Sequence, residues 1–161
     1  MRILFLVLSL PRTGAEEAKV VRAAPSILIT DDDLSFRETL QSMFQPQGFH
    51  TLLAGDGEEA LDIIRSKEVH IVLLDMHMPK LTGLETIRRV KDIKALLPCI
   101  LLSADADEAL VRQALTARAD SVLRKPVTRQ RITSVVQQAL ERTYHWPDFQ
   151  LPGSDRFRGN P

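Results

Sequence analysis

Residues 71–75 read Ile71-Val72-Leu73-Leu74-Asp75, four apolar residues that run directly into a carboxylate. A strand buried on both faces of a parallel sheet reads as a continuous apolar run, because helices cover each side of the sheet. This stretch therefore indicates an α/β fold. It also predicts that Asp75 lies where a buried strand ends.

Four further apolar runs lie on either side of this stretch, and helical patterns separate them. The five runs are Ile27-Leu28-Ile29, Thr51-Leu52-Leu53, Ile71-Val72-Leu73-Leu74, Ile100-Leu101-Leu102 and Val122-Leu123. This alternation predicts a doubly wound α/β domain with a five-stranded parallel sheet. The last helix is expected over about 128–144, where apolar residues recur on one stripe at helical spacing.

Helix starts are predicted from acidic and hydroxyl residues that precede a glutamate by three positions. Asp33 is expected to act as a helix cap rather than as a metal ligand. The predicted capping boxes pair Ser35 with Glu38, Asp56 with Glu59, and Asp105 with Glu108.

The 161 residues are enough for one compact domain, expected over residues 26–144. Residues 1–25 are interpreted as an extension that precedes the domain, because their apolar start is too short to span a bilayer. Residues 145–161 are interpreted as a tail, since they contain three prolines and two glycines. Because the apolar start is too short to span a bilayer, we expect no membrane partner.

Charge and cysteine content exclude several classes of function. Lys plus Arg and Asp plus Glu both number 21, so there is no overall positive field that would hold the chain on nucleic acid. We therefore expect no nucleic-acid partner. The chain has one cysteine, Cys99, which excludes disulfides within the chain. Because Cys99 lies in an apolar run, it is interpreted as a buried small hydrophobe.

Polar residues follow four of the five apolar runs. In a doubly wound sheet, ligands bind beyond the carboxyl ends of the strands, so these residues are expected to meet at one edge. They are Thr30-Asp31-Asp32-Asp33, Asp75, Ser103-Ala104-Asp105 and Arg124-Lys125-Pro126.

Each residue type at this edge has a chemical purpose. The carboxylates of Asp31, Asp32 and Asp75 would repel one another, and a hard divalent cation relieves that repulsion with oxygen ligands. Mg²⁺, or Mn²⁺ in its place, is the expected metal. Lys125 supplies a point charge for phosphoryl oxygens, and Ser103 supplies a hydroxyl donor.

These same segments resemble the receiver domain of bacterial two-component response regulators, over residues 26–144. The matching segments are Ile27-Leu28-Ile29-Thr30-Asp31-Asp32-Asp33, Ile71-Val72-Leu73-Leu74-Asp75-Met76-His77-Met78-Pro79 with Gly83, Leu102-Ser103-Ala104, and Lys125-Pro126. The resemblance implies a flavodoxin-like (βα)5 fold with strand order 2-1-3-4-5. It also makes Lys125-Pro126 a candidate cis peptide bond.

The resemblance further assigns a role to each residue of the site. It implies that Asp75 accepts the phosphoryl group, and that Asp31, Asp32 and the backbone carbonyl of His77 hold the metal with it. Ser103, the amide of Ala104 and Lys125 would contact the phosphoryl group. The side chains of His77 and Asp105 would tune the lifetime of the phosphorylated state.

The chain departs from the family pattern at one switch position. Receiver domains usually have an aromatic residue three positions before the lysine, and this chain has Val122 there. The switch hydroxyl is Ser103, where threonine is often found. Both departures preserve the phosphorylation chemistry, but they place the usual aromatic readout through Val122 in question.

By this resemblance the chain is a cytoplasmic, stand-alone response regulator rather than a conventional enzyme. It would take a phosphoryl group from a sensor histidine kinase or a histidine phosphotransfer protein, and would catalyse its own phosphorylation and dephosphorylation. A downstream protein would read the face formed by the fourth helix, fifth strand and fifth helix, which could also form a homodimer.

Four alternatives to this interpretation exist. A haloacid-dehalogenase-like phosphatase needs a second acid two residues after the nucleophile, where this chain has His77. A DNA-binding output module needs more residues than the roughly 17 that follow the last expected helix. A receiver-like binding platform and a fragment of a larger regulator remain alternatives.

Overall fold

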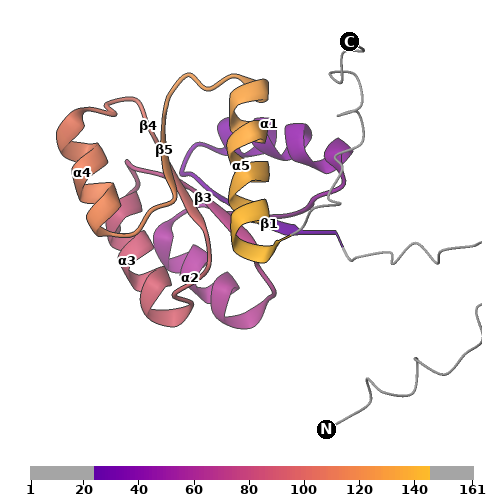
Figure 1. The fold of residues 1–161 in the computed structure, drawn as a ribbon, viewed down its shortest axis with the longest axis horizontal. Helices are drawn as coiled ribbons and strands as arrows, with labels where there is room; N and C mark the ends of the chain where they lie inside the picture. The colour runs from indigo at the N-terminus through magenta and orange to yellow at the C-terminus, as the bar shows by residue number, and fades with distance from the viewer. Residues whose placement is uncertain (1–23, 146–161) are drawn as a thin grey trace, which may run out of the picture.

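The computed structural model describes residues 24–145, so the expectations on residues 1–23 and 146–161 lie outside the described residues. Five parallel strands form a sheet in the order β2-β1-β3-β4-β5, with helices on both faces (Figure 1). The predicted flavodoxin-like doubly wound fold is therefore confirmed. Of the helices in residues 24–145, none has the length and apolar character needed to cross a membrane.

Strands and helices alternate along the described chain. The strands are β1 (Ser26–Thr30), β2 (His50–Ala54), β3 (Ile71–Asp75), β4 (Cys99–Ser103) and β5 (Ser121–Arg124). The helices are α1 (Leu34–Phe44), α2 (Gly57–Ser66), α3 (Gly83–Ile93), α4 (Glu108–Thr116) and α5 (Arg129–Tyr144), with a 3-10 turn η2 (Gln45–Gln47) after α1. Each predicted apolar run lies within one of these strands.

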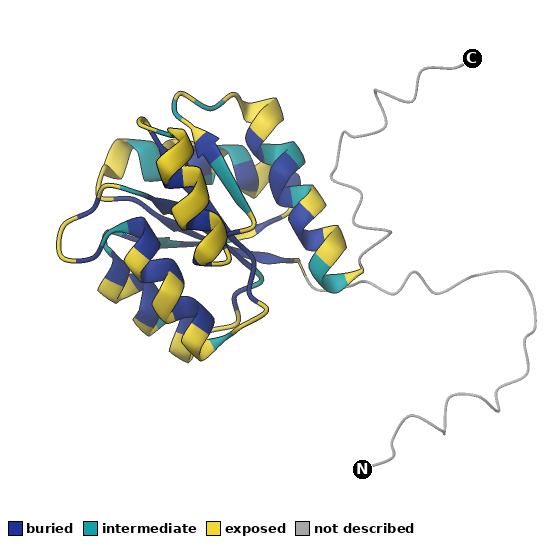
Figure 2. Ribbon diagram, turned by 60° about the vertical axis from the view of Figure 1, so that its left-hand side comes forward, coloured by how far each residue is buried: buried dark blue, intermediate teal, exposed yellow. Residues whose placement is uncertain are grey.

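Two hydrophobic cores lie on opposite faces of the sheet. Alternate strand residues such as Leu28 and Leu74 pack with α2, α3 and α4, whereas Ile29 and Leu73 pack with α1 and α5. Figure 2 shows the result, with a buried sheet between helices that expose their outer faces. This two-sided burial is the reason that the central residues of β1, β3 and β4 are all apolar.

Cys99 lies within the core at the start of β4 and is fully buried, as predicted. Burial raises the pKa of its thiol to about 12. A thiol with such a pKa contains almost no thiolate at neutral pH and is chemically inert.

Two of the three predicted capping boxes are wrong, because a neighbouring aspartate caps the helix instead. Asp33 caps α1 by accepting the N–H of Phe36, which places Ser35 inside the first turn. Asp107 caps α4 by accepting the N–H of Leu110, so Asp105 lies before the helix. The expected role of Asp33 as a cap is confirmed.

The third predicted helix start, at Asp56, is confirmed, but the Glu59 side chain binds a different backbone N–H from the one expected. The Asp56 carboxylate accepts the N–H of Glu59, as a cap of α2 should. The Glu59 carboxylate accepts the N–H of Gly55 rather than that of Asp56. Thr82 and Glu85 form a complete capping box at the start of α3, which was not predicted from the sequence.

Candidate functional site

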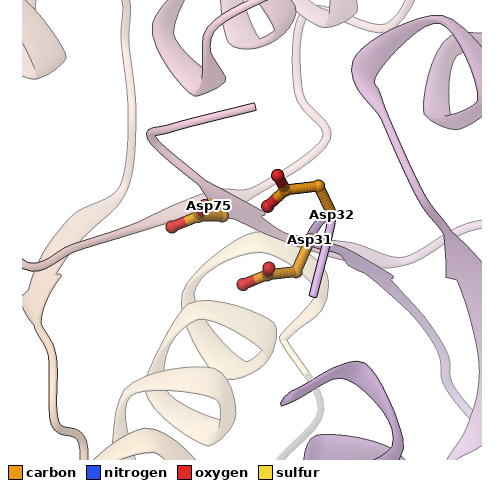
Figure 3. A group of neighbouring side chains, drawn as sticks. All are labelled: Asp31, Asp32 and Asp75. Atoms are coloured by element: carbon orange, nitrogen blue, oxygen red, sulfur yellow. The ribbon is translucent and has the colours of Figure 1, made fainter. Parts of the chain in front are cut away.

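Three aspartates meet at the carboxyl edge of the sheet (Figure 3). Asp31 and Asp32 follow β1, and Asp75 is the last residue of the neighbouring parallel strand β3. One carboxylate oxygen from each lies within 4.8 Å of the others. Asp31 and Asp75 are buried and Asp32 is exposed, so the cluster opens to solvent on the side of Asp32.

Lys125 joins the two buried carboxylates. Its Nζ lies 2.9 Å from Asp31 Oδ2 and 2.9 Å from Asp75 Oδ1. The residue follows β5 directly, and the bond between Lys125 and Pro126 is cis, as the resemblance implied. One ammonium thus balances part of the negative charge of three carboxylates.

The pKa values of two groups reflect this arrangement. Burial raises the pKa of Asp75, the hydrogen bond from Lys125 opposes that rise, and the negative charge of Asp31 adds to it. Burial alone would lower the pKa of Lys125, but its hydrogen bonds with Asp31 and Asp75 outweigh burial, so the pKa is raised. Lys125 is therefore a fixed positive charge beside Asp75 at neutral pH.

Ser103 ends β4 and is fully buried at the same edge of the sheet. Its Oγ accepts the N–H of Asp105 at 3.2 Å. His77 Nε2 lies 3.5 Å from Asp105 Oδ2, and both side chains are exposed. The two predicted lifetime-tuning residues therefore face each other across the opening between the loops that follow β3 and β4.

A small hollow of about 220 Å³ adjoins these loops. Residues of the loop after β3, the end of β4 and helix α4 line it, among them Met76, His77, Ser103, Asp105 and Leu110. Ala104 is exposed beside Ser103. Val122, on β5, is partly buried and packs against the core that α4 helps to form.

Two residues of α1 also contact the site, and neither was predicted from the sequence. The Lys125 Nζ lies 4.1 Å from the centre of the Phe36 ring. The Arg37 guanidinium donates to the backbone carbonyl of Asp31. Neither contact has a sequence signal, because both depend on how α1 packs against the end of β1.

The donor set fits a hard divalent cation. Three carboxylates supply oxygen ligands within reach of one centre, and one side is exposed to water. Asp31 Oδ1 accepts the N–H of Asp33, which fixes the direction of that carboxylate. The roles assigned to Asp31, Asp32, Asp75 and the His77 carbonyl as ligands remain predictions.

Comparison with known proteins gives a consistent result. The family model described as "Response regulator receiver domain" matches residues 27–137. The response regulator MprA of Mycolicibacterium vanbaalenii is 37% identical over 117 residues, which cover 73% of this chain and 51% of that protein. The transcriptional regulatory protein ZraR of Salmonella typhimurium is 30% identical over 124 residues, covering 77% and 28%.

A solved structure agrees in fold with the described domain. The signal receiver domain of an HD domain-containing protein from Pseudomonas fluorescens Pf-5 superposes with a TM-score of 0.73 at 28% identity, covering 76% of this chain and 98% of that one. The chain spans about half the length of MprA and less of ZraR. The similarity therefore covers only part of each of these regulators.

Proposed function

This chain belongs to the family of response regulator receiver domains, and on that basis we propose that it is a signalling switch phosphorylated on Asp75. The observation that carries the proposal is the buried Asp75 carboxylate at the end of β3, with the Lys125 ammonium 2.9 Å from one of its oxygens. The donor we propose is a phosphohistidine on a sensor histidine kinase or a histidine phosphotransfer protein.

The proposed reaction is a direct transfer. A carboxylate oxygen of Asp75 attacks phosphorus while the bond from phosphorus to the donor imidazole nitrogen breaks, and that nitrogen keeps the electron pair. Lys125 neutralises charge on the phosphoryl oxygens, and Ser103 and the Ala104 amide donate hydrogen bonds to them. Hydrolysis of the acyl phosphate by water returns Asp75 to its free form.

A divalent metal is part of this proposal. Bound Mg²⁺ or Mn²⁺ would neutralise the carboxylates and accept a phosphoryl oxygen. Asp31, Asp32 and Asp75, together with the His77 carbonyl, would hold it. Lys125, whose Nζ lies 2.9 Å from Asp75 Oδ1, would contact the phosphoryl oxygens.

The output we propose is a protein contact. The face formed by α4, β5 and α5 would change on phosphorylation and would be read by a downstream protein in the cytoplasm or by a second copy of this chain. Leu115, 67% exposed, and Val111, 38% exposed, lie one helical turn apart on α4 and supply an apolar contact for such a partner.

Intact-mass analysis after incubation with acetyl phosphate and Mg²⁺ tests the central claim. We expect one added phosphoryl group on the wild type, and none with EDTA or in Asp75→Asn. A wild-type chain that gains no mass, or an Asp75→Asn variant labelled at the wild-type rate, would contradict the assignment.

A second candidate is that this sequence acts as the receiver portion of a longer regulator. The partial coverage of MprA and ZraR favours it. The mass of the natural protein isolated from its own cells separates the two candidates, because the phosphorylation chemistry of the receiver is the same in both.

A further inference from the structure

The ammonium of Lys125 has three partners in the described structure, and one of them carries no charge. Two are the carboxylates of Asp31 and Asp75, each at 2.9 Å. The third is the ring of Phe36, whose centre lies 4.1 Å from Nζ. A cation at this distance from an aromatic face is attracted by the negative potential of the ring.

The Phe36 ring is held in place from two directions. Its backbone N–H donates to the Asp33 carboxylate that caps α1, so the start of the helix is fixed. Its side chain is partly buried and packs against the core formed by α1, α5 and one face of the sheet. The backbone at Phe36 is therefore fixed, and the ring contacts both the core and Lys125.

Phe36 differs from Asp31 and Asp75 in that its contact with Lys125 does not oppose phosphorylation. When Asp75 carries a phosphoryl group, Lys125 must exchange a carboxylate oxygen for a phosphoryl oxygen. A carboxylate competes with the phosphoryl group for the ammonium, whereas an aromatic face attracts the ammonium without offering an anion that competes. The ring can therefore stay in contact with Lys125 in both states.

Holding the lysine also reduces its conformational freedom. A lysine side chain loses rotamer entropy when it is fixed in one position. If the Phe36 ring restricts the lysine before the reaction, less entropy is lost during phosphoryl transfer itself.

We propose that Phe36 is a positioning residue, which holds the Lys125 ammonium beside Asp75 for phosphoryl transfer. The inference rests on the proposed function and adds a residue to it. Phe36 acts through Lys125 and does not itself touch the phosphoryl group.

Two substitutions separate the aromatic face from simple packing. Phe36→Leu keeps an apolar side chain in the core but removes the ring, and Phe36→Tyr keeps the ring. We expect Phe36→Leu to lower the rate of labelling by acetyl phosphate about three- to tenfold, and Phe36→Tyr to stay within about twofold of wild type.

Phe44→Leu serves as the matched control for loss of a phenyl ring from α1. Phe44 is fully buried in the same core and its ring packs against Phe49, far along the helix from the site. This control should lower the unfolding temperature and leave the labelling rate within about twofold. It shows whether a drop in rate follows from reduced stability alone.

NMR of the unphosphorylated protein supplies a readout that does not depend on activity. Protons held over the face of an aromatic ring are shifted upfield by the ring current. The Hε and Hζ signals of Lys125 should therefore be upfield in the wild type and in Phe36→Tyr, and should return toward ordinary lysine positions in Phe36→Leu.

The outcomes are distinct. An ordinary Lys125 shift in the wild type, a Phe36→Leu variant that is labelled at the wild-type rate, or a Phe36→Tyr variant as slow as Phe36→Leu would each overturn the role of Phe36 while wild-type labelling stands. A wild-type chain that is not labelled at all would instead overturn the proposed function, and this inference with it.

Discussion

Asp75 combines two properties that oppose each other. As the proposed nucleophile it must be ionised, yet burial and the nearby negative charge of Asp31 both raise its pKa, and only Lys125, through its hydrogen bond and its positive charge, favours the charged form. Because the pKa is raised in the folded state, ionisation of Asp75 lowers the stability of the fold. The ionised carboxylate that the proposed reaction needs therefore destabilises the fold.

Replacing that charge should stabilise the fold in a pH-dependent way. Below the ordinary pKa of 3.8 the carboxyl is protonated in both folded and unfolded chains, so Asp75→Asn should change stability little. As the pH rises through the raised folded pKa, the wild type loses stability relative to the variant. Thermal unfolding in EDTA at pH 4 and pH 7 measures this difference.

We expect Asp75→Asn to unfold at a higher temperature than wild type at pH 7, and the gain to shrink at pH 4. Asp62→Asn is the control, because Asp62 is an acid on α2 with its side chain 79% exposed. An Asp75→Asn variant that is less stable than wild type at pH 7 would show that Lys125 more than compensates the burial of this carboxylate.

His77 and Asp105 meet at the opening of the site, and their contact should affect water access. The pair is exposed, so it adds little to stability. Replacing both residues with alanine opens the path of the hydrolytic water, and we expect the phosphorylated form to decay about three- to tenfold faster. The decay can be followed by intact mass after removal of the phosphodonor.

The exposed pair of Glu108 and Arg112 on α4 is the matched control for that experiment, since it is also a surface ion pair. Its double alanine variant should decay at the wild-type rate. Equal decay of the His77 and Asp105 double variant and the wild type would remove these residues from the control of lifetime.

At the scale of the elements, the join between β3 and α3 shapes the site most closely. The first residue of α3 is Gly83, and its N–H donates to the carbonyl of Met76. A Cβ at this position would lie 2.5 Å from the carbonyl oxygen of Asp75 and 2.6 Å from Leu101 Cδ1. The helix can begin this close to the end of the strand only because the residue has no side chain.

Gly83→Ala should therefore disturb both stability and chemistry. Alanine favours a helix by about 0.5–1 kcal/mol over glycine, but the overlap with backbone should outweigh this gain and destabilise the fold by about 1–3 kcal/mol. The shift of the Asp75 backbone should also slow labelling by acetyl phosphate. Urea unfolding and intact-mass kinetics measure the two effects.

Gly48→Ala separates these effects, because a Cβ there would meet no atom within 4 Å and only its positive φ of 93° is unfavourable. We expect Gly48→Ala to lose stability and to keep its labelling rate. If Gly83→Ala is as stable and as fast as wild type, the close approach of α3 to β3 has no effect on the site.

At the scale of the whole molecule, the signal must travel from Asp75 to the face formed by α4, β5 and α5. Ser103 is buried at the end of β4, and Val122 on the neighbouring strand β5 packs against the core beside α4. If Ser103 moves toward a phosphoryl group, Val122 can fill the space only in part, because valine is small and has few rotamers. The two states then differ little in free energy.

We therefore expect phosphorylation of the wild type to change this face modestly, and Val122→Tyr to change it more. The measurement is NMR shift perturbation over residues 104–117 and 122–131, with and without a phosphoryl mimic. Asp75→Asn in each background is the control and should not respond. A large cooperative change in the wild type would contradict the idea that Val122 weakens the switch.

Local features of the fold and the site could be predicted from the sequence better than long-range contacts. The five strands and the meeting of Asp31, Asp32 and Asp75 follow from apolar runs and from the rule that parallel strands end at one edge. The strands are properties of short segments, and the meeting of the aspartates also needs the strand order, which the family resemblance implied.

Only the tertiary structure decided between Asp33 and Ser35 as the cap of α1, and between Asp105 and Asp107 as the cap of α4, because neighbouring residues of these types compete for the same role. It also placed the Phe36 ring over Lys125 and the Arg37 guanidinium against the carbonyl of Asp31. Both contacts depend on the position of α1 relative to the sheet, and the contact of Phe36 with Lys125 also joins residues far apart in the chain. Local periodicity contains no information about that position.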